Sequence, residues 1–227
     1  MIYIALPSYD GTRRNASTFV EFTKHTRHDV VLMENSCSLL ARCFNDCWVA
    51  ALNARAKGNV THFLMMHADI IPQAPFLDIL VDEMTRVGAD VLSVVSPIKC
   101  SEGVTSTSIE MQDKWHPRRL TMTEIFQRQE TWTEEGLLIN TGLMLIDFTK
   151  PWVEEICFTI SDEIRKKEDG TFEALVEPED WHFSRQARGL GAKIFATRKI
   201  KLNHIGIGVF GNHGIWGTCT TDPVYRK

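Results

Sequence analysis

Short apolar segments alternate with longer segments of helical periodicity along the first half of the chain. The expected strands are 2–7, 29–33, 61–66 and 90–95, and the expected helices are 16–27, 37–57 and 75–87. Alternation of strands and helices is typical of a mostly parallel sheet that is covered by helices on both faces. The pattern therefore predicts an α/β fold.

The second half of the chain has a less regular pattern. Polar residues dominate 100–119, and residues 205–227 are punctuated by glycine, so we expect the C-terminal tail to be irregular. Between them the expected elements are a helix at 121–128, a strand at 143–146, a helix at 179–189, and strands at 193–196 and 199–203. A chain of 227 residues without internal repeats is expected to form a single domain over 1–227.

Composition and charge exclude some classes of protein. The chain carries 25 Lys and Arg against 29 Asp and Glu, a net charge of −4 that argues against binding polyanions through bulk charge. The longest apolar stretch, 137–148, is interrupted by polar residues and is shorter than the roughly 18 residues of a membrane span. The N-terminus has neither a basic region nor a cleavage site, so we expect a cytoplasmic protein.

The charges are unevenly distributed. Segment 130–180 has fourteen acidic side chains and four basic ones, whereas segment 181–221 has six basic side chains and no acidic one. Two interpretations follow: the two segments attract each other within the fold, or the basic segment contacts a diphosphate or a polyanion.

Two residues at expected strand ends have the chemistry of metal ligands. Open α/β sheets bind ligands beyond the carboxyl ends of their strands. Asp69 follows the strand at 61–66, and His204 follows the strand at 199–203. One carboxylate and one imidazole suit Mn²⁺ or Mg²⁺, with diphosphate oxygens and water as further ligands. The alternatives are a structural turn acid and a histidine bonded to backbone.

Further candidates lie at the starts of two expected helices. The sequence Glu177-Pro178-Glu179-Asp180-Trp181 has more acid than helix capping requires, and a carboxylate there is suited to act as a general base toward a hydroxyl. On the helix at 37–57, Arg42 and Asn45 are about one turn apart and face together. They have the chemistry to hold a phosphate or a base, and the alternative is that they face solvent.

Taken together, these features resemble the nucleotide-sugar-dependent glycosyltransferases of the GT-A fold, especially the compact ones of phage and metagenomic sequences. The likeness covers most of the chain. It is carried in order by residues 5–11, 38–45, 61–69, 140–142, 179–181 and 203–206. In that family the strand-end motif is Asp-x-Asp, and its last acid binds the cation that bridges the donor diphosphate. Asp69 matches this last acid, and His67 replaces the first.

The resemblance implies a Rossmann-like GT-A fold and the transfer of a sugar from a nucleoside diphosphate donor, with UDP expected as the nucleotide. Residues 1–97 would form the donor half and residues 98–227 the acceptor half with the C-terminal tail. Asp69 and His204 would hold Mn²⁺ or Mg²⁺. Asp180, supported by Glu179, would deprotonate the acceptor in an inverting enzyme or orient it in a retaining one. The residues expected at the donor are Pro7, Ser8, Tyr9, Asp10, Arg42, Asn45 and His67.

The sequence leaves the acceptor and two rival functions open. The acceptor is either a hydroxymethylated DNA base, with phosphate contacts from 118–119 and 185–201, or a glycan. One rival function is a non-catalytic module that binds nucleotide or nucleic acid on the same fold. The other is a nucleotidyltransferase, which the lack of a glycine-rich phosphate loop disfavours.

Overall fold

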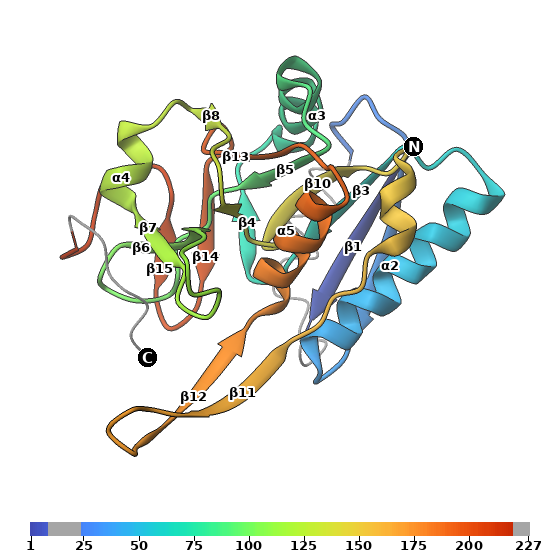
Figure 1. Ribbon diagram of the computed structural model, residues 1–227. Helices are drawn as coiled ribbons and strands as arrows, with labels where there is room; N and C mark the ends of the chain where they lie inside the picture. The colour runs from blue at the N-terminus through green and yellow to red at the C-terminus, as the bar shows by residue number, and fades with distance from the viewer. Residues whose placement is uncertain (9–23, 220–227) are drawn as a thin grey trace.

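The computed structural model describes residues 1–8 and 24–219. Its centre is a mixed sheet of seven strands (Figure 1). In spatial order the strands are β2 (Val30–Ser36), β1 (Ile2–Ser8), β3 (His62–Met66), β10 (Leu143–Asp147), β5 (Val91–Val94), β13 (Ile194–Thr197) and β8 (Thr131–Trp132). Strand β1 is parallel to β2 and β3, and β13 is parallel to β5, whereas β10 and β8 run antiparallel to their neighbours. The expected mostly parallel α/β sheet is confirmed.

Helices cover both faces of this sheet, as expected. Along β1, Ile2 and Ile4 pack in the core on the side of α3 (Phe76–Val87), while Tyr3 and Ala5 face the opposite core with α2 (Leu40–Lys57) and α5 (Glu179–Gly189). This alternation follows from the two-residue period of a strand. Within the described residues the helices are α2, α3, α4 (Met122–Gln127), α5 and the short 3₁₀ helix η1 (Pro151–Glu155).

Two smaller sheets and a hairpin complete the fold. One sheet joins β4 (Ile70–Pro72), β14 (Leu202–Ile205) and β15 (Val209–Gly211), and the other joins β6 (Val104–Ile109), β7 (Arg118–Thr121) and β9 (Leu137–Leu138). The hairpin of β11 (Ser161–Lys166) and β12 (Phe172–Glu177) projects from the body of the molecule (Figure 1). No helix in the described part of the chain is both long enough and apolar enough to cross a bilayer.

The sequence pattern missed β6 and β7 because they lie in a segment of mostly polar residues, and several of the buried positions of β6 are polar. Thr105 and Thr107 on β6 are fully buried although a hydropathy pattern places them in a loop. The Thr105 hydroxyl donates to the carbonyl of Leu120 at 2.8 Å. Hydrogen bonds of this kind remove the cost of burying a hydroxyl, so a strand with polar buried positions becomes stable.

Asn212 fastens the small β4–β14–β15 sheet to the central sheet. Its side chain is 2% exposed, and its Oδ1 accepts from the backbone N–H of Leu202 at 2.8 Å. Its Nδ2 donates to the carbonyls of Val95 and Ile200, both at 3.0 Å. One amide therefore satisfies three buried backbone groups, and it sets the position of β14, the strand that carries His204.

We expect Asn212→Ala to lower the free energy of unfolding by about 3 kcal/mol, because it leaves three buried backbone groups without partners. Urea denaturation followed by circular dichroism measures this change. The matched control is Asn53→Ala at an exposed position of α2, which should change stability by less than about 0.5 kcal/mol. Equal effects of the two substitutions would contradict this role of Asn212.

Candidate functional site

The candidate site lies at the carboxyl edge of the central sheet. The parallel strands β1, β2 and β3 end at this edge, and the N–H of Cys37 donates to the carbonyl of Ser8 at 3.1 Å, which joins the ends of β1 and β2. Pro7 and Ser8 therefore lie at the carboxyl edge of the sheet, the edge at which open α/β sheets bind ligands. Tyr9 and Asp10 lie outside the described residues.

Asp69 and His204 are brought together between the central sheet and the small sheet. Asp69 lies in the turn from β3 to β4, and His204 Nε2 is 3.4 Å from Asp69 Oδ2. His204 lies within β14, opposite Ile70, and not after a strand as the sequence pattern predicted. The reason is that β14 begins later than expected and pairs with β4. This pairing is what carries the imidazole to the carboxylate.

Lys99 was not anticipated and forms an ion pair with Asp69. Its ammonium group contacts Asp69 Oδ2, the same oxygen that faces His204. The side chain crosses Gly206, where an added Cβ would lie 2.7 Å from Lys99 Cδ. The missing side chain at Gly206 thus leaves space for the lysine to reach the carboxylate.

The hydrogen bonds of His204 determine what its second nitrogen can do. His204 Nδ1 is 2.7 Å from the carbonyl of Pro97, which only accepts, so Nδ1 carries a hydrogen. In the neutral imidazole, Nε2 then carries a lone pair that is available to a cation, as in metal-ligating histidines that are held by a backbone carbonyl. In the protonated imidazole, Nε2–H instead donates to Asp69 Oδ2. Asp69 Oδ1 is buried without a hydrogen-bond partner. These two atoms fit the ligands of Mn²⁺ or Mg²⁺.

The rest of a metal coordination sphere would have to come from outside this pair. Among residues 1–8 and 24–219, no group of three or more His, Cys, Asp or Glu side chains has a metal-binding arrangement. Diphosphate oxygens and water are the ligands that complete such a site in enzymes that bind nucleotides with Mg²⁺.

Asp69 and His67 differ in charge. Burial raises the pKa of the Asp69 carboxyl, but the contacts with His204 and Lys99 lower it by more, so the carboxyl is ionised at neutral pH. Burial lowers the pKa of His67 to about 4, so this imidazole is neutral. His67 Nε2 is 3.2 Å from the hydroxyl of Thr141, and its ring packs on Phe44. His67 is thus a neutral polar group beside the ionised Asp69.

Asp180 and Glu179 form a second carboxyl pair at the start of α5. Glu179 is 8% exposed, and burial raises its pKa. Burial and the charge of Glu179 raise the pKa of Asp180 to about 8. The N–H of Trp181 donates to Asp180 Oδ1 at 2.8 Å and partly opposes this shift. Asp180 is therefore largely protonated at neutral pH. As the pH rises toward 8 the carboxyl ionises, and the carboxylate can then accept a proton.

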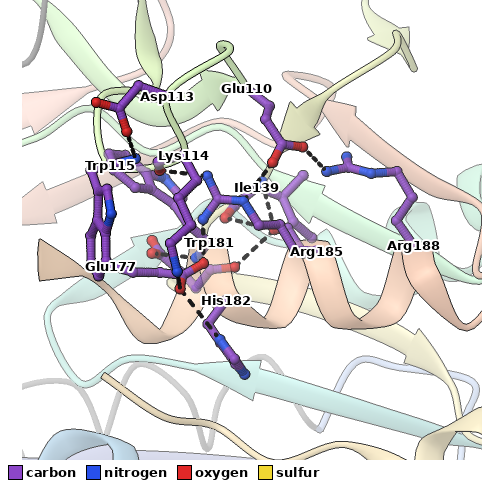
Figure 2. A network of polar contacts seen from close by, with 12 residues as sticks. Glu110, Asp113, Lys114, Trp115, Ile139, Glu177, Trp181, His182, Arg185 and Arg188 are labelled. Atoms are coloured by element: carbon purple, nitrogen blue, oxygen red, sulfur yellow. Dashed lines mark hydrogen bonds and ion pairs between the residues drawn. The ribbon is translucent and has the colours of Figure 1, made fainter. Parts of the chain in front are cut away.

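A network of ion pairs holds α5 in place (Figure 2). Arg185 Nε is 2.7 Å from Glu110 Oε1, and the same guanidinium contacts the buried Glu177. Arg188 reaches the other oxygen of Glu110 at 2.7 Å. His182 Nδ1 is 3.6 Å from Glu177 Oε2. Because α5 is fixed at several points along its length, the carboxyl pair at its N-terminus is fixed as well.

Several basic residues that the sequence suggested for phosphate contacts have partners within the fold. Arg185 and Arg188 bind the acids just described, and Lys199 Nζ is 2.8 Å from Glu83. Arg118 pairs with Glu124, and Arg119 lies over the ring of Trp181 at 5.1 Å. The basic side chains of 181–221 named here are thus engaged within the fold, but only Glu177 among their partners belongs to segment 130–180.

Segment 139–142 links the two carboxyl clusters. The N–H of Ile139 donates to Ser184 on α5 at 3.0 Å. Three residues later, the carbonyl of Gly142 accepts from the N–H of His67 at 2.9 Å. Asn140 braces the turn, because its Oδ1 accepts from the N–H of Gly142 at 3.0 Å. The Asp69 and Asp180 clusters are thus attached to opposite ends of one short braced segment.

Arg42 and Asn45 have different surroundings on α2. Arg42 is 68% exposed and pairs with Asp46 at 2.9 Å, one turn along the helix. Asn45 uses both ends of its amide on the backbone of Phe158, donating at 2.7 Å and accepting at 2.8 Å. Arg42 is accessible to a ligand, whereas the structure shows Asn45 joining α2 to the segment before the hairpin.

Comparison with solved structures identifies similar folds. The chain is similar to A197 from STIV, with a TM-score of 0.54 and 14% identity over 90% of this chain and 85% of that one. It is also similar to S. aureus TarS 1–349 in complex with UDP-GlcNAc, with a TM-score of 0.42 and 10% identity over 87% of this chain and 56% of that one. The likeness to A197 shows a shared fold. No protein-family model matches the chain, and no curated protein matches it.

The ion pair of Lys99 with Asp69 predicts competition between the lysine and a divalent cation. We expect Lys99→Met to raise the affinity for Mn²⁺ about tenfold, because the ammonium group no longer neutralises the carboxylate. Electron paramagnetic resonance of free Mn²⁺ measures this affinity. The control is Lys150→Met, which removes a lysine paired with Asp90 and should leave Mn²⁺ affinity unchanged. An equal affinity in wild type and Lys99→Met would disprove the competition.

The raised pKa of Asp180 predicts a pH-dependent stability. The folded state holds this proton more tightly than the unfolded state, so the protonated carboxyl is favourable at low pH and the advantage is lost as pH rises toward 8. Relative to wild type, Asp180→Asn should therefore gain more than about 1 kcal/mol between pH 5 and pH 8. Denaturation at several pH values tests this. Asp162→Asn, on the exposed strand β11, should show no such gain.

Proposed function

We propose that this protein is a GT-A glycosyltransferase that transfers a sugar from a UDP-sugar to an acceptor hydroxyl. The observation that carries the proposal is the presence of two carboxyl clusters, one ionised and the other largely protonated at neutral pH. Asp69 is ionised beside a histidine and a lysine, and Asp180 has a pKa near 8. Segment 139–142 supports the proposal, because it hydrogen-bonds to His67 near the first cluster and to Ser184 on the helix that begins with the second. Open α/β sheets bind nucleotides beyond the carboxyl ends of their strands.

On the donor side, Asp69 Oδ1 and His204 Nε2 would hold Mn²⁺ or Mg²⁺ against the diphosphate. When bound, such an ion acts as a Lewis acid that stabilises charge on the leaving diphosphate. Lys99 supplies a second positive charge at the same place. Pro7, Ser8 and His67 line the edge beside it, and Arg42 is free to turn from Asp46 toward a phosphate.

On the acceptor side, Asp180 is the proposed base. The acceptor oxygen forms a bond to the anomeric carbon, the bond from that carbon to the diphosphate breaks, and the acceptor proton passes to an Asp180 carboxylate oxygen. A pKa near 8 makes a carboxylate an effective base near neutral pH. Glu179, which is buried behind it, maintains that pKa. In a retaining enzyme Asp180 would orient the acceptor instead.

The test is a screen of nucleotide sugars with Mn²⁺, followed by an acceptor panel that contains glycans and hydroxymethylated DNA. Asp180→Asn should lower the transfer rate about 10²–10⁴-fold, because a positioned base is lost, while the affinity for donor stays the same. The wild-type rate should rise with pH up to about 8 as Asp180 loses its proton. Asp162→Asn is the control and should keep full activity.

Two results would contradict the proposal. Transfer by Asp180→Asn at the wild-type rate would remove Asp180 from the reaction. Failure of wild type to release nucleoside diphosphate from any donor, with or without acceptor, would favour the non-catalytic binding module.

A further inference from the structure

A cavity of about 440 Å³ lies beside the candidate site, in the C-terminal part of the described chain. Aromatic rings form much of its wall, since Phe210 and Trp216 both line it with ring centroids 5.8 Å apart. His213 and Ser101 also line it, with backbone from Gly211 and Gly214. The volume is in the range of small-molecule sites.

The cavity borders the residues proposed to hold the donor. Strand β15 pairs with β14, and Phe210 lies directly opposite His204. Directly opposed residues of an antiparallel pair project from the same face of a sheet. Phe210 and the cavity that it lines therefore lie next to the imidazole that contacts Asp69.

The walls are held by contacts that do not involve a ligand. Trp216 Nε1 donates to the carbonyl of Gly211 at 2.7 Å, which fixes the indole across the loop. The backbone at Trp216 crosses closely over Gly103, where an added Cβ would lie 2.0 Å from the Trp216 carbonyl oxygen. The N–H of Cys219 donates to the carbonyl of Glu102 at 3.0 Å. The aromatic surface is thus formed before a ligand binds, which reduces the entropic cost of binding.

The chemistry of the lining favours an uncharged ligand. The cavity is lined by no Asp, Glu, Lys or Arg side chain of the described residues. Lys99, whose side chain passes Gly206 between β14 and β15, is paired with Asp69. A phosphate-bearing polymer would need free cations at this position. The apolar face of a sugar ring needs an aromatic surface, and its hydroxyls need polar groups such as those of Ser101 and His213.

We propose that this cavity, which we call the aromatic pocket, binds a neutral sugar ring of the acceptor. This proposal rests on the proposed function and adds the substrate class, a neutral glycan. The pocket places such a ring beside His204, so that a hydroxyl of the acceptor lies at the donor edge of the sheet.

The experiment uses saturation-transfer NMR with the methyl glycosides of glucose, galactose, mannose and N-acetylglucosamine as probes, and the nucleoside of 5-hydroxymethylcytosine as the competing class. At least one glycoside should bind wild type through its ring C–H protons. Trp216→Ala should weaken that binding about tenfold or more, since the largest aromatic wall is gone. The matched control is Trp115→Ala, because Trp115 is a partly exposed tryptophan that does not line the pocket.

Phe210→Ala provides a second test if Trp216→Ala does not fold, as judged by circular dichroism. Binding of no glycoside to wild type, or glycoside binding that neither pocket variant changes, would overturn the proposal. Binding of the nucleoside alone, lost in the same variants, would also overturn it in favour of a nucleic-acid acceptor.

Calorimetry with UDP and Mn²⁺ separates this proposal from the proposed function. The pocket variants should bind UDP as wild type does. If wild type binds a glycoside at Trp216 but no UDP, the result contradicts the proposed function and still supports a sugar-binding aromatic pocket. If wild type binds UDP but the pocket binds none of the four glycosides, the pocket proposal alone fails.

Discussion

The ionised carboxylate of Asp69, held between β3 and β4, is the constraint on which the candidate site depends. A carboxylate that is partly withdrawn from water is stabilised by positive charge or hydrogen-bond donors around it. Lys99 supplies a positive charge, and His204, which donates from Nε2 when it is protonated, contacts the same oxygen. The two residues come from different parts of the chain. Strand β14 must pair with β4 to bring His204, and Asn212 must hold that pair to the central sheet. The position of the small sheet is therefore what brings His204 to Asp69.

The pKa of Asp180 is raised, whereas that of Asp69 is lowered. Asp180 is buried beside another carboxyl group, and nothing in its surroundings compensates fully, so its pKa rises. Two carboxyl groups whose environments push their pKa values apart are the usual mark of divided chemical roles. Placing the Asp180 and Glu179 carboxyl groups side by side is unfavourable. Helix α5, which carries both, is stabilised by ion pairs of its Arg185 and Arg188 with Glu110 and Glu177 (Figure 2). Stability from that network allows an unfavourable carboxyl pair to persist at the helix N-terminus.

The sequence predicted the parts of the fold whose burial is apolar and periodic. Helix α5 was expected at 179–189 and is found there, and the strands β1, β3 and β10 lie within two residues of their expected bounds. Strand β6 was missed because it buries polar residues, among them Thr105, whose hydroxyl is satisfied by a hydrogen bond that a hydropathy pattern does not register. The hairpin of β11 and β12 was missed because β11 carries mostly charged side chains and shows no alternation of apolar and polar positions.

The sequence indicated candidate site residues but not the contacts among them. Asp69, His204 and Asp180 were identified from strand ends and a helix start, yet Lys99 gave no signal, since a single lysine in a polar segment is ordinary. The role of Asn45 in joining α2 to Phe158 depends on a contact across 113 residues, which no local pattern contains. Long-range pairing decides such features, and only the folded chain reveals them.

The most direct measurement is the paramagnetic broadening of backbone amide signals by Mn²⁺ in the presence of UDP, recorded on isotope-labelled protein. Our account predicts that the broadened signals come from segments 67–70, 97–99 and 203–206, which surround Asp69 and His204. It also predicts that Asp69→Ala abolishes the broadening. Broadening centred elsewhere in the chain, or unchanged broadening in Asp69→Ala, would contradict the claim that these residues form the donor site.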